Sequence, residues 1–140
     1  MAVGYSGTPL PKKLGLKDNT RFVVINEPED YLALLGPLPP GLEMQNTLSQ
    51  STNLVHVFVS KRQALSRHLA TLRSKLNPEA AVWVSWPKKS SKVPSEVTED
   101  TIRELALPLG FVDIKVCAVS EVWSGLKLTV RKELRNSSEA

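Results

Sequence analysis

Three lysines and two serines follow a short apolar run that holds two tryptophans. The run ends at Trp86, and the loop over residues 86–93 adds Lys88, Lys89 and Ser90. Ammonium groups and hydroxyls can hold phosphates and carboxylates, and a tryptophan offers a face for stacking. We call this segment the lysine loop and predict that it binds an anionic small molecule or a protein partner. The alternative is a solvated basic loop beside a buried tryptophan.

A second group of polar and aromatic residues lies near the C-terminus, and we expect it to form the other wall of this site. Its members are Trp123, Ser124 and Lys127. If residues 120–125 make a turn between two strands, alternation places Asp113 and Lys115 on one face, with Asp113 opposite Arg131. The alternative is that these residues form the solvent-exposed face of a hairpin at the edge of the sheet.

The remaining candidates for chemistry are weak. Cys117 stands between apolar residues in a predicted strand, where a buried structural cysteine is expected. His56 lies in an apolar run and is expected to be a satisfied core histidine, while His68 falls on a helix. Two lone histidines without ligand spacing do not make a metal site. We therefore predict no catalytic residues and no metal.

The elements that must position these residues are read from hydrophobic periodicity. Strands are predicted over residues 21–26, 54–59, 80–86, 111–119 and 126–130, and helices over 31–35, 60–76 and 98–109. This β-α-β-α-β-α-β-β order predicts a three-layer, Rossmann-like α/β sandwich with a mostly parallel, five-stranded sheet. The last two strands should pair as an antiparallel hairpin, which is also how the sheets of class I methyltransferases end.

In an open parallel sheet, ligands bind beyond the carboxyl ends of the strands, so three loops matter: residues 26–30, 59–62 and the lysine loop. Residues 26–30 read NEPED, and we call them the acidic loop. A dinucleotide or S-adenosylmethionine site of the usual kind wants a glycine-rich turn there. The carboxylates disfavour a phosphate-bearing cofactor. They are weaker evidence against S-adenosylmethionine, because its sulfonium is cationic. We predict no cofactor.

The chain of 140 residues fits one domain. We predict an irregular lead-in over residues 1–20, a single α/β domain over 21–132 and a disordered tail over 133–140. A structureless connection as long as residues 36–53 is uncommon in a compact domain, so we expect a small element near residues 42–48 or a plain loop, with a functional lid as the alternative.

The charge is mildly basic, with 18 Lys and Arg against 14 Asp and Glu and a net charge of +4. That excess permits anionic partners without demanding nucleic acid. One cysteine suits a reducing compartment, the first residues lack the apolar region of a secretory signal, and no apolar run is long enough for a membrane helix. We therefore expect a cytoplasmic protein without membrane partners.

Three segments are similar to a bacterial family known as a domain of unknown function, DUF3052. They are residues 4–15 (GYSGTPLPKKLG), 83–93 (WVSWPKKSSKV) and 110–132 (GFVDIKVCAVSEVWSGLKLTVRK). The resemblance spans nearly the whole chain and implies a small bacterial cytoplasmic protein. It brings no established activity and no catalytic residues.

The leading hypothesis is a non-enzymatic or regulatory domain that binds through the lysine loop. A second hypothesis is a degenerate enzyme of methyltransferase-like descent whose cofactor loop was lost or rebuilt. A third is weak nucleic-acid binding through the lysine loop and the basic helix over residues 61–75, with affinity that falls steeply with salt.

Overall fold

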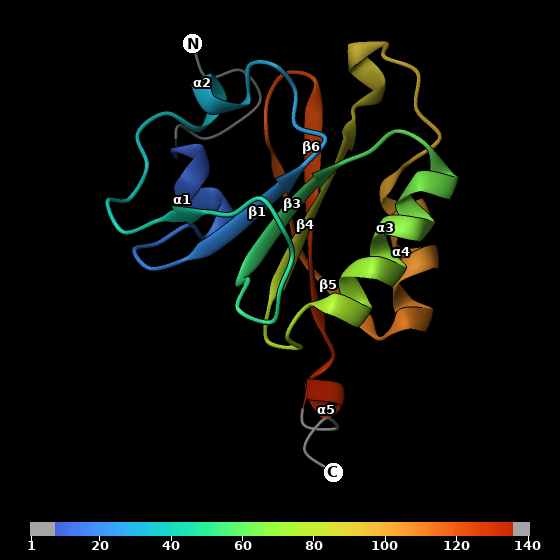
Figure 1. The fold of residues 1–140 in the computed structure, drawn as a ribbon. Coiled ribbons are helices and arrows are strands. Elements are labelled where there is room, and N and C mark those ends of the chain that lie inside the picture. Colours follow the sequence, from blue (N-terminus) through green and yellow to red (C-terminus); the bar gives the residue numbers. More distant parts are fainter. Residues whose placement is uncertain (1–7, 136–140) are drawn as a thin grey trace.

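A six-stranded sheet lies between two layers of helices in the computed structural model, which describes residues 8–135 (Figure 1). The strands are β1 (Arg21–Ile25), β2 (Glu43–Met44), β3 (Leu54–Phe58), β4 (Ala81–Pro87), β5 (Phe111–Ala118) and β6 (Trp123–Val130). Their order is β2-β1-β3-β4-β6-β5, and β6 runs antiparallel to the other five described strands. The predicted Rossmann-like fold with a closing antiparallel hairpin is confirmed.

The sheet has one strand more than predicted. β2 has two residues, lies within the unassigned segment 36–53 and pairs in parallel with β1. A strand of two exposed residues leaves no periodic apolar pattern to read, which is why only a small element near residues 42–48 could be expected.

Two helices cover each face of the sheet. α3 (Arg62–Lys75) and α4 (Glu99–Ala106) lie on one face, while α1 (Leu10–Leu14) and α2 (Tyr31–Leu35) lie on the other (Figure 1). α5 (Lys132–Arg135) follows β6, and the short 3-10 helices η1 (Lys89–Ser91) and η2 (Leu107–Leu109) complete the described elements.

Apolar side chains on both faces of the sheet explain this arrangement. Every residue of β3 is buried, as expected for a parallel strand covered on both sides. α3 buries the stripe of Leu65, Leu69 and Leu72 against one face. On the other face, Phe22, Tyr31 and Trp83 pack with the leucines of α1. The two clusters make one continuous three-layer domain.

The predicted lead-in is not irregular throughout, because α1 forms within it. Leu10, Leu14 and Leu16 are buried, and the Trp83 side chain donates a hydrogen bond from Nε1 to the Leu14 carbonyl over 2.9 Å. Residues 1–7 of the predicted lead-in and 136–140 of the predicted tail lie outside the described residues.

An irregularity in β5 changes which side chains share a face. The pairing of β5 with β6 shifts between Asp113 and Lys115, which places Asp113 opposite Leu128 and Lys115 opposite Lys127. Asp113 then turns to α4, where its carboxylate accepts a hydrogen bond from Arg103 over 3.0 Å. The prediction that Asp113 shares a face with Lys115 and lies opposite Arg131 is wrong. The irregularity breaks strict alternation, and the hairpin is centred on residue 121 instead of the predicted 122; together these move the partner of Asp113 from Arg131 to Leu128.

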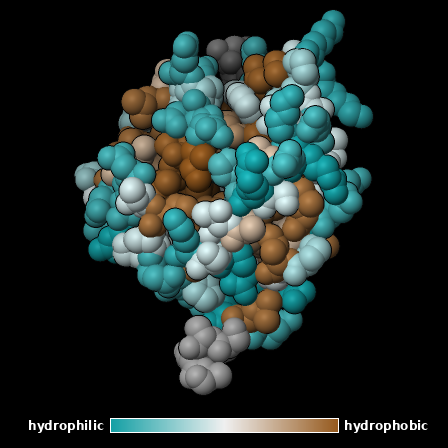
Figure 2. All heavy atoms as spheres, turned by 45° about the vertical axis from the view of Figure 1, so that its right-hand side comes forward, coloured by the Kyte–Doolittle hydropathy of each residue, from teal (hydrophilic) through white to brown (hydrophobic). Residues whose placement is uncertain are grey.

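Figure 2 shows the molecule with its α3 and α4 side turned forward. Hydrophilic side chains cover most of this surface, and they surround a hollowed apolar area. Among the residues that the structure describes, no helix combines the length and apolar character that crossing a membrane requires.

Candidate functional site

The carboxyl ends of β1, β3 and β4 meet at one edge of the sheet, at the top of Figure 1. We call it the carboxyl edge. Three pockets open there or next to it, and each takes residues from the loops that follow these strands. Ligands of open parallel sheets bind at this edge.

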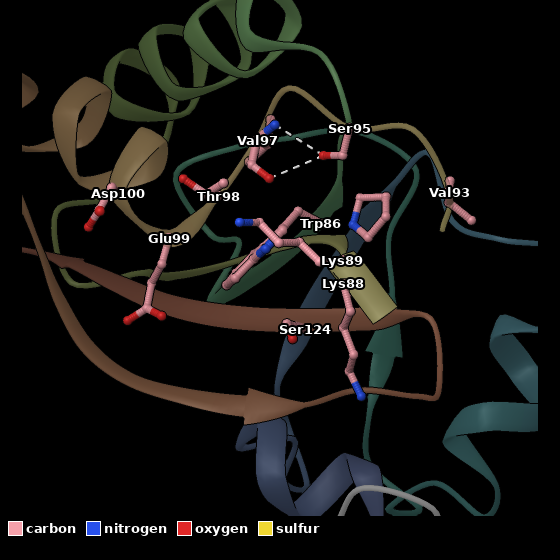
Figure 3. Close-up of a pocket in the computed structure, with 11 residues that line it drawn as sticks. Trp86, Lys88, Lys89, Val93, Ser95, Val97, Thr98, Glu99, Asp100 and Ser124 are labelled. Atoms are coloured by element: carbon pink, nitrogen blue, oxygen red, sulfur yellow. Dashed lines mark hydrogen bonds between the residues drawn. The ribbon is translucent and has the colours of Figure 1, made fainter. Parts of the chain in front are cut away.

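The first pocket, of about 470 Å³, lies between the lysine loop and the first turn of α4 and is called the lysine pocket (Figure 3). Its lining consists of Trp86, Pro87, Lys88, Lys89, Val93, Ser95, Val97, Thr98, Glu99, Asp100 and Ser124. Thr98 caps α4 through a reciprocal bond with Thr101, which is the predicted helix start and fixes this wall.

The charges around the lysine pocket are of both signs. Glu99 and Asp100 pair with Arg103 of the same helix, so their negative charge is partly compensated. Figure 3 shows the Lys88 side chain directed away from α4, toward and past Ser124. The pocket is therefore not a cradle of converging cations, which is what strong anion binding requires.

The structure brings together only part of the predicted site. Four predicted residues line the lysine pocket: Trp86, Lys88, Lys89 and Ser124. Ser90 lies exposed in η1, and Trp123 lies beside Phe58 of β3, with ring centroids 4.9 Å apart. Trp123 and Ser124 belong to β6 and not to a turn, so their side chains alternate between faces.

Lys127 faces α1 on the opposite side of the sheet from α4. It pairs with Trp83 of β4 and Lys115 of β5, and its ammonium lies 6.0 Å from the Trp83 ring centroid. Burial lowers the pKa of Lys127, and the neighbouring Lys115 and Lys17 lower it further. The prediction that Lys127 forms a wall with the lysine loop is wrong, because neighbouring positions of a strand face opposite sides.

The strand order reverses at β1. The chain leaves β1 toward β2 on one side and returns to β3 on the other, so β1 and β3 form the topological switch point of the sheet. Two crossovers diverge there and leave a crevice between the loops that follow the two strands.

A pocket of about 290 Å³ lies at this point, and we call it the switch-point pocket. Its lining consists of Asn26, Phe58, Val59, Ser60, Lys61, Ala64 and Trp123. Residues after β3 were expected to matter from the carboxyl-end rule. The contribution of Trp123 could not be read from the sequence, because β6 reaches the pocket from the other end of the chain.

The acidic loop separates the switch-point pocket from a third pocket, of about 390 Å³, on the β2 side. Asn26 lines the first, while Glu27 and Glu29 line the third together with Tyr31 and Leu32. Asn26 has φ of 60°, a left-handed conformation that asparagine tolerates and that glycine usually supplies. The tight turn is thus kept without glycine.

The expectation of a satisfied core histidine is confirmed for His56, whereas Cys117 is less buried than expected. His56 is fully buried and hydrogen-bonded on both ring nitrogens. Cys117 is half-buried, and burial raises the pKa of its thiol, which disfavours a nucleophilic thiolate. Residues 8–135 contain no group of three or more His, Cys, Asp or Glu side chains that could hold a metal ion.

The basic helix proposed for nucleic-acid binding is α3. Lys61, Arg62 and Arg67 are exposed on it, and Arg62 is paired with Glu104 over 3.0 Å. Salt-dependent binding of nucleic acid through this face stays a prediction.

Several solved structures share this fold. An S-adenosylmethionine-dependent methyltransferase from Aquifex aeolicus has a TM-score of 0.59 at 11% identity, over 86% of this chain and 87% of that one. A putative type 11 methyltransferase from Sulfolobus solfataricus has a TM-score of 0.57 at 11% identity, over 88% and 90%. The B. subtilis M1A22 tRNA methyltransferase TrmK has a TM-score of 0.55 at 8% identity, over 96% and 70%. No protein-family model matches the sequence, and none of the curated proteins is similar to it.

The leading hypothesis from the sequence, a non-enzymatic domain that binds through the lysine loop, is contradicted by these neighbours. Identities near 11% establish only the fold, and that fold is the one the second hypothesis expects. Composition alone favours the lysine loop, whereas the position of the switch point depends on strand order, which composition does not reveal.

Proposed function

We propose that this chain is a methyltransferase-like domain that binds S-adenosylmethionine at the switch-point pocket through a rebuilt, glycine-free loop. The observation that supports this best is the switch point itself. A pocket opens between the ends of β1 and β3, in a sheet whose antiparallel β6 stands between β4 and β5. Switch points are where open α/β sheets bind their ligands.

The residues around the switch-point pocket fit the charges of this cofactor. S-adenosylmethionine carries a cationic sulfonium, an ammonium and a carboxylate, and when bound it supplies an electrophilic methyl group. Lys61 after β3 lines the pocket and suits its carboxylate, while Glu27 and Glu29 line the neighbouring third pocket and act on its cations from there. Trp123, which is half-buried and packs edge-on against Phe58, adds aromatic surface for a nucleobase.

The acidic loop departs from the usual pattern in one respect. Glycine lets a ligand approach the backbone closely, whereas Asn26 keeps the left-handed turn but adds a side chain at the same place. We therefore expect recognition by side chains and an affinity in the range of about 1 mM or tighter.

Titration calorimetry with S-adenosylmethionine and its demethylated product tests the proposal. We expect S-adenosylmethionine to bind, and we expect Glu27→Gln with Glu29→Gln to weaken its binding about tenfold, because two carboxylates beside the pocket no longer attract its cationic groups. The product, a neutral thioether, should lose less affinity. No heat and no retention in equilibrium dialysis at about 1 mM would refute the proposal.

The matched control also removes two negative charges, but at residues near the opposite edge of the sheet. Glu79→Gln with Glu133→Gln alters exposed carboxylates that pair with Arg135 and Arg131. We expect cofactor affinity to be unchanged in this variant. If the control weakens binding as much as the acidic-loop variant, the effect comes from net charge and the site is misplaced.

We also propose that the chain is a relative of the DUF3052 family and acts in the bacterial cytoplasm. The amino-acid sequences of residues 110–132 and of the lysine loop support the family relation. The single cysteine supports the cytoplasmic location.

A further inference from the structure

Three polar side chains form a buried chain of hydrogen bonds through the middle of the sheet. The Tyr31 hydroxyl lies 2.7 Å from His56 Nδ1, and His56 Nε2 lies 2.6 Å from the Ser85 hydroxyl. Tyr31 is 2% exposed, and His56 and Ser85 are 0% exposed. The chain links the start of α2 to the central strands β3 and β4.

The order hydroxyl, imidazole and orienting group is also that of an activated nucleophile, but burial excludes this role for Ser85. The Phe58 ring stacks on His56 with centroids 4.3 Å apart, and Tyr31 meets both rings edge-on. A nucleophile must reach its substrate, and no surface path leads to a fully buried hydroxyl. The chain therefore acts on structure rather than on a substrate.

Burial keeps His56 neutral, and a neutral imidazole has one donor and one acceptor. In either tautomer it donates to one hydroxyl and accepts from the other. Ser85 sits in the middle of β4, whose backbone is paired on both sides. That strand cannot shift easily, so the imidazole transmits a fixed orientation to Tyr31.

Tyr31 is the side chain that ties the acidic loop to the core. Its backbone N–H bonds the Pro28 carbonyl over 3.0 Å, within the loop. α2 has only five residues, and no described side chain caps its start at Asp30. Beside Leu35, Tyr31 is the one residue of α2 that is buried. The position of the acidic loop therefore depends strongly on the buried Tyr31 side chain.

We propose that His56 is a positioning residue that holds Tyr31, and through it the acidic loop, in one orientation at the carboxyl edge. The inference deepens the proposed function, since this loop is the one assigned to the cofactor. In a usual cofactor site, the close packing of a glycine-rich turn fixes the backbone of this loop. Here the hydrogen bond between Tyr31 and His56 fixes it instead.

Amide hydrogen exchange in two matched variants tests the inference without any ligand. Tyr31→Phe and Ser85→Ala each remove one hydroxyl from the same imidazole and keep the rest of the packing. We expect Tyr31→Phe to raise the exchange rates of described amides in residues 26–32 about tenfold, because a buried hydrogen bond to the anchor is lost. Ser85→Ala leaves Tyr31 its hydrogen bond to the imidazole but removes the group that fixes the ring, so those rates should rise less, by about threefold.

Amides of β3 and β4 report global unfolding in both variants and correct for any general loss of stability. Unchanged loop exchange in Tyr31→Phe would overturn the inference, and so would equal increases in both variants, which would make the chain a general stabiliser. Because the readout is the loop itself, a failure here is distinct from a failure to bind S-adenosylmethionine.

Discussion

Replacing Trp83 with alanine should lower the free energy of unfolding by about 3 to 5 kcal/mol, which is a large share of the stability of a domain this size. Trp83 is the largest fully buried side chain described, and it packs between the sheet and α1. The substitution removes its buried area, leaves a cavity, and deletes the 2.9 Å hydrogen bond that its indole donates to the Leu14 carbonyl. Urea denaturation monitored by circular dichroism measures the change.

Two further variants make the Trp83 result specific. Trp123→Ala, at a half-buried tryptophan on the same face of the sheet, should cost clearly less. Trp83→Phe keeps an aromatic ring but loses the indole N–H, and should cost roughly 1 to 2 kcal/mol while loosening α1. If Trp83→Ala is no more destabilising than Trp123→Ala, α1 is not held by this contact.

Acid should destabilise the domain through His56. Burial among aromatic rings lowers the pKa of His56 to about 3, against an ordinary value of 6.5. Below pH 6.5 the His56 imidazole therefore binds a proton in the unfolded chain but stays unprotonated in the folded chain. Stability from this group is complete above pH 6.5 and is lost as pH falls toward 3, by about 2 to 3 kcal/mol between pH 7 and pH 4.5.

The measurement is the free energy of unfolding as a function of pH, in the original protein and in His56→Gln. Glutamine cannot titrate, so its stability should fall less steeply over the same range, whatever its starting stability. Tyr31, which faces the ring, stays neutral here because burial raises the pKa of its hydroxyl. Parallel curves for the two proteins would show that His56 is not the group responsible.

The helices and longer strands could be predicted because their patterns are local. The leucines of α3 repeat at helical spacing, and the apolar runs of β1, β3 and β4 have strand length. Thr98 with Glu99 and Asp100 marked the start of α4, and the structure has the cap there. The burial of His56 also followed from its apolar neighbours.

The candidate site could be predicted only in part, because its residues come from strands that are distant in the sequence. The composition of the lysine loop pointed to binding, and three of its predicted residues line one pocket with only one of the three expected partners, Ser124. Trp123 and Lys127 belong to the same strand, yet they meet different elements: Phe58 at the switch point for one, and α1 with Lys115 for the other. Strand length and a register shift decide such neighbours, and neither has a local signal.

The sequence by itself determined the fold class, since alternating helical and extended apolar patterns allow few ways to bury their faces. The tertiary structure alone decided the strand order, and with it the switch point between β1 and β3. It also decided that Tyr31, His56 and Ser85 join in one buried chain. Pairing between strands depends on contacts across long stretches of chain, so the location of the functional edge emerges only when the sheet is assembled.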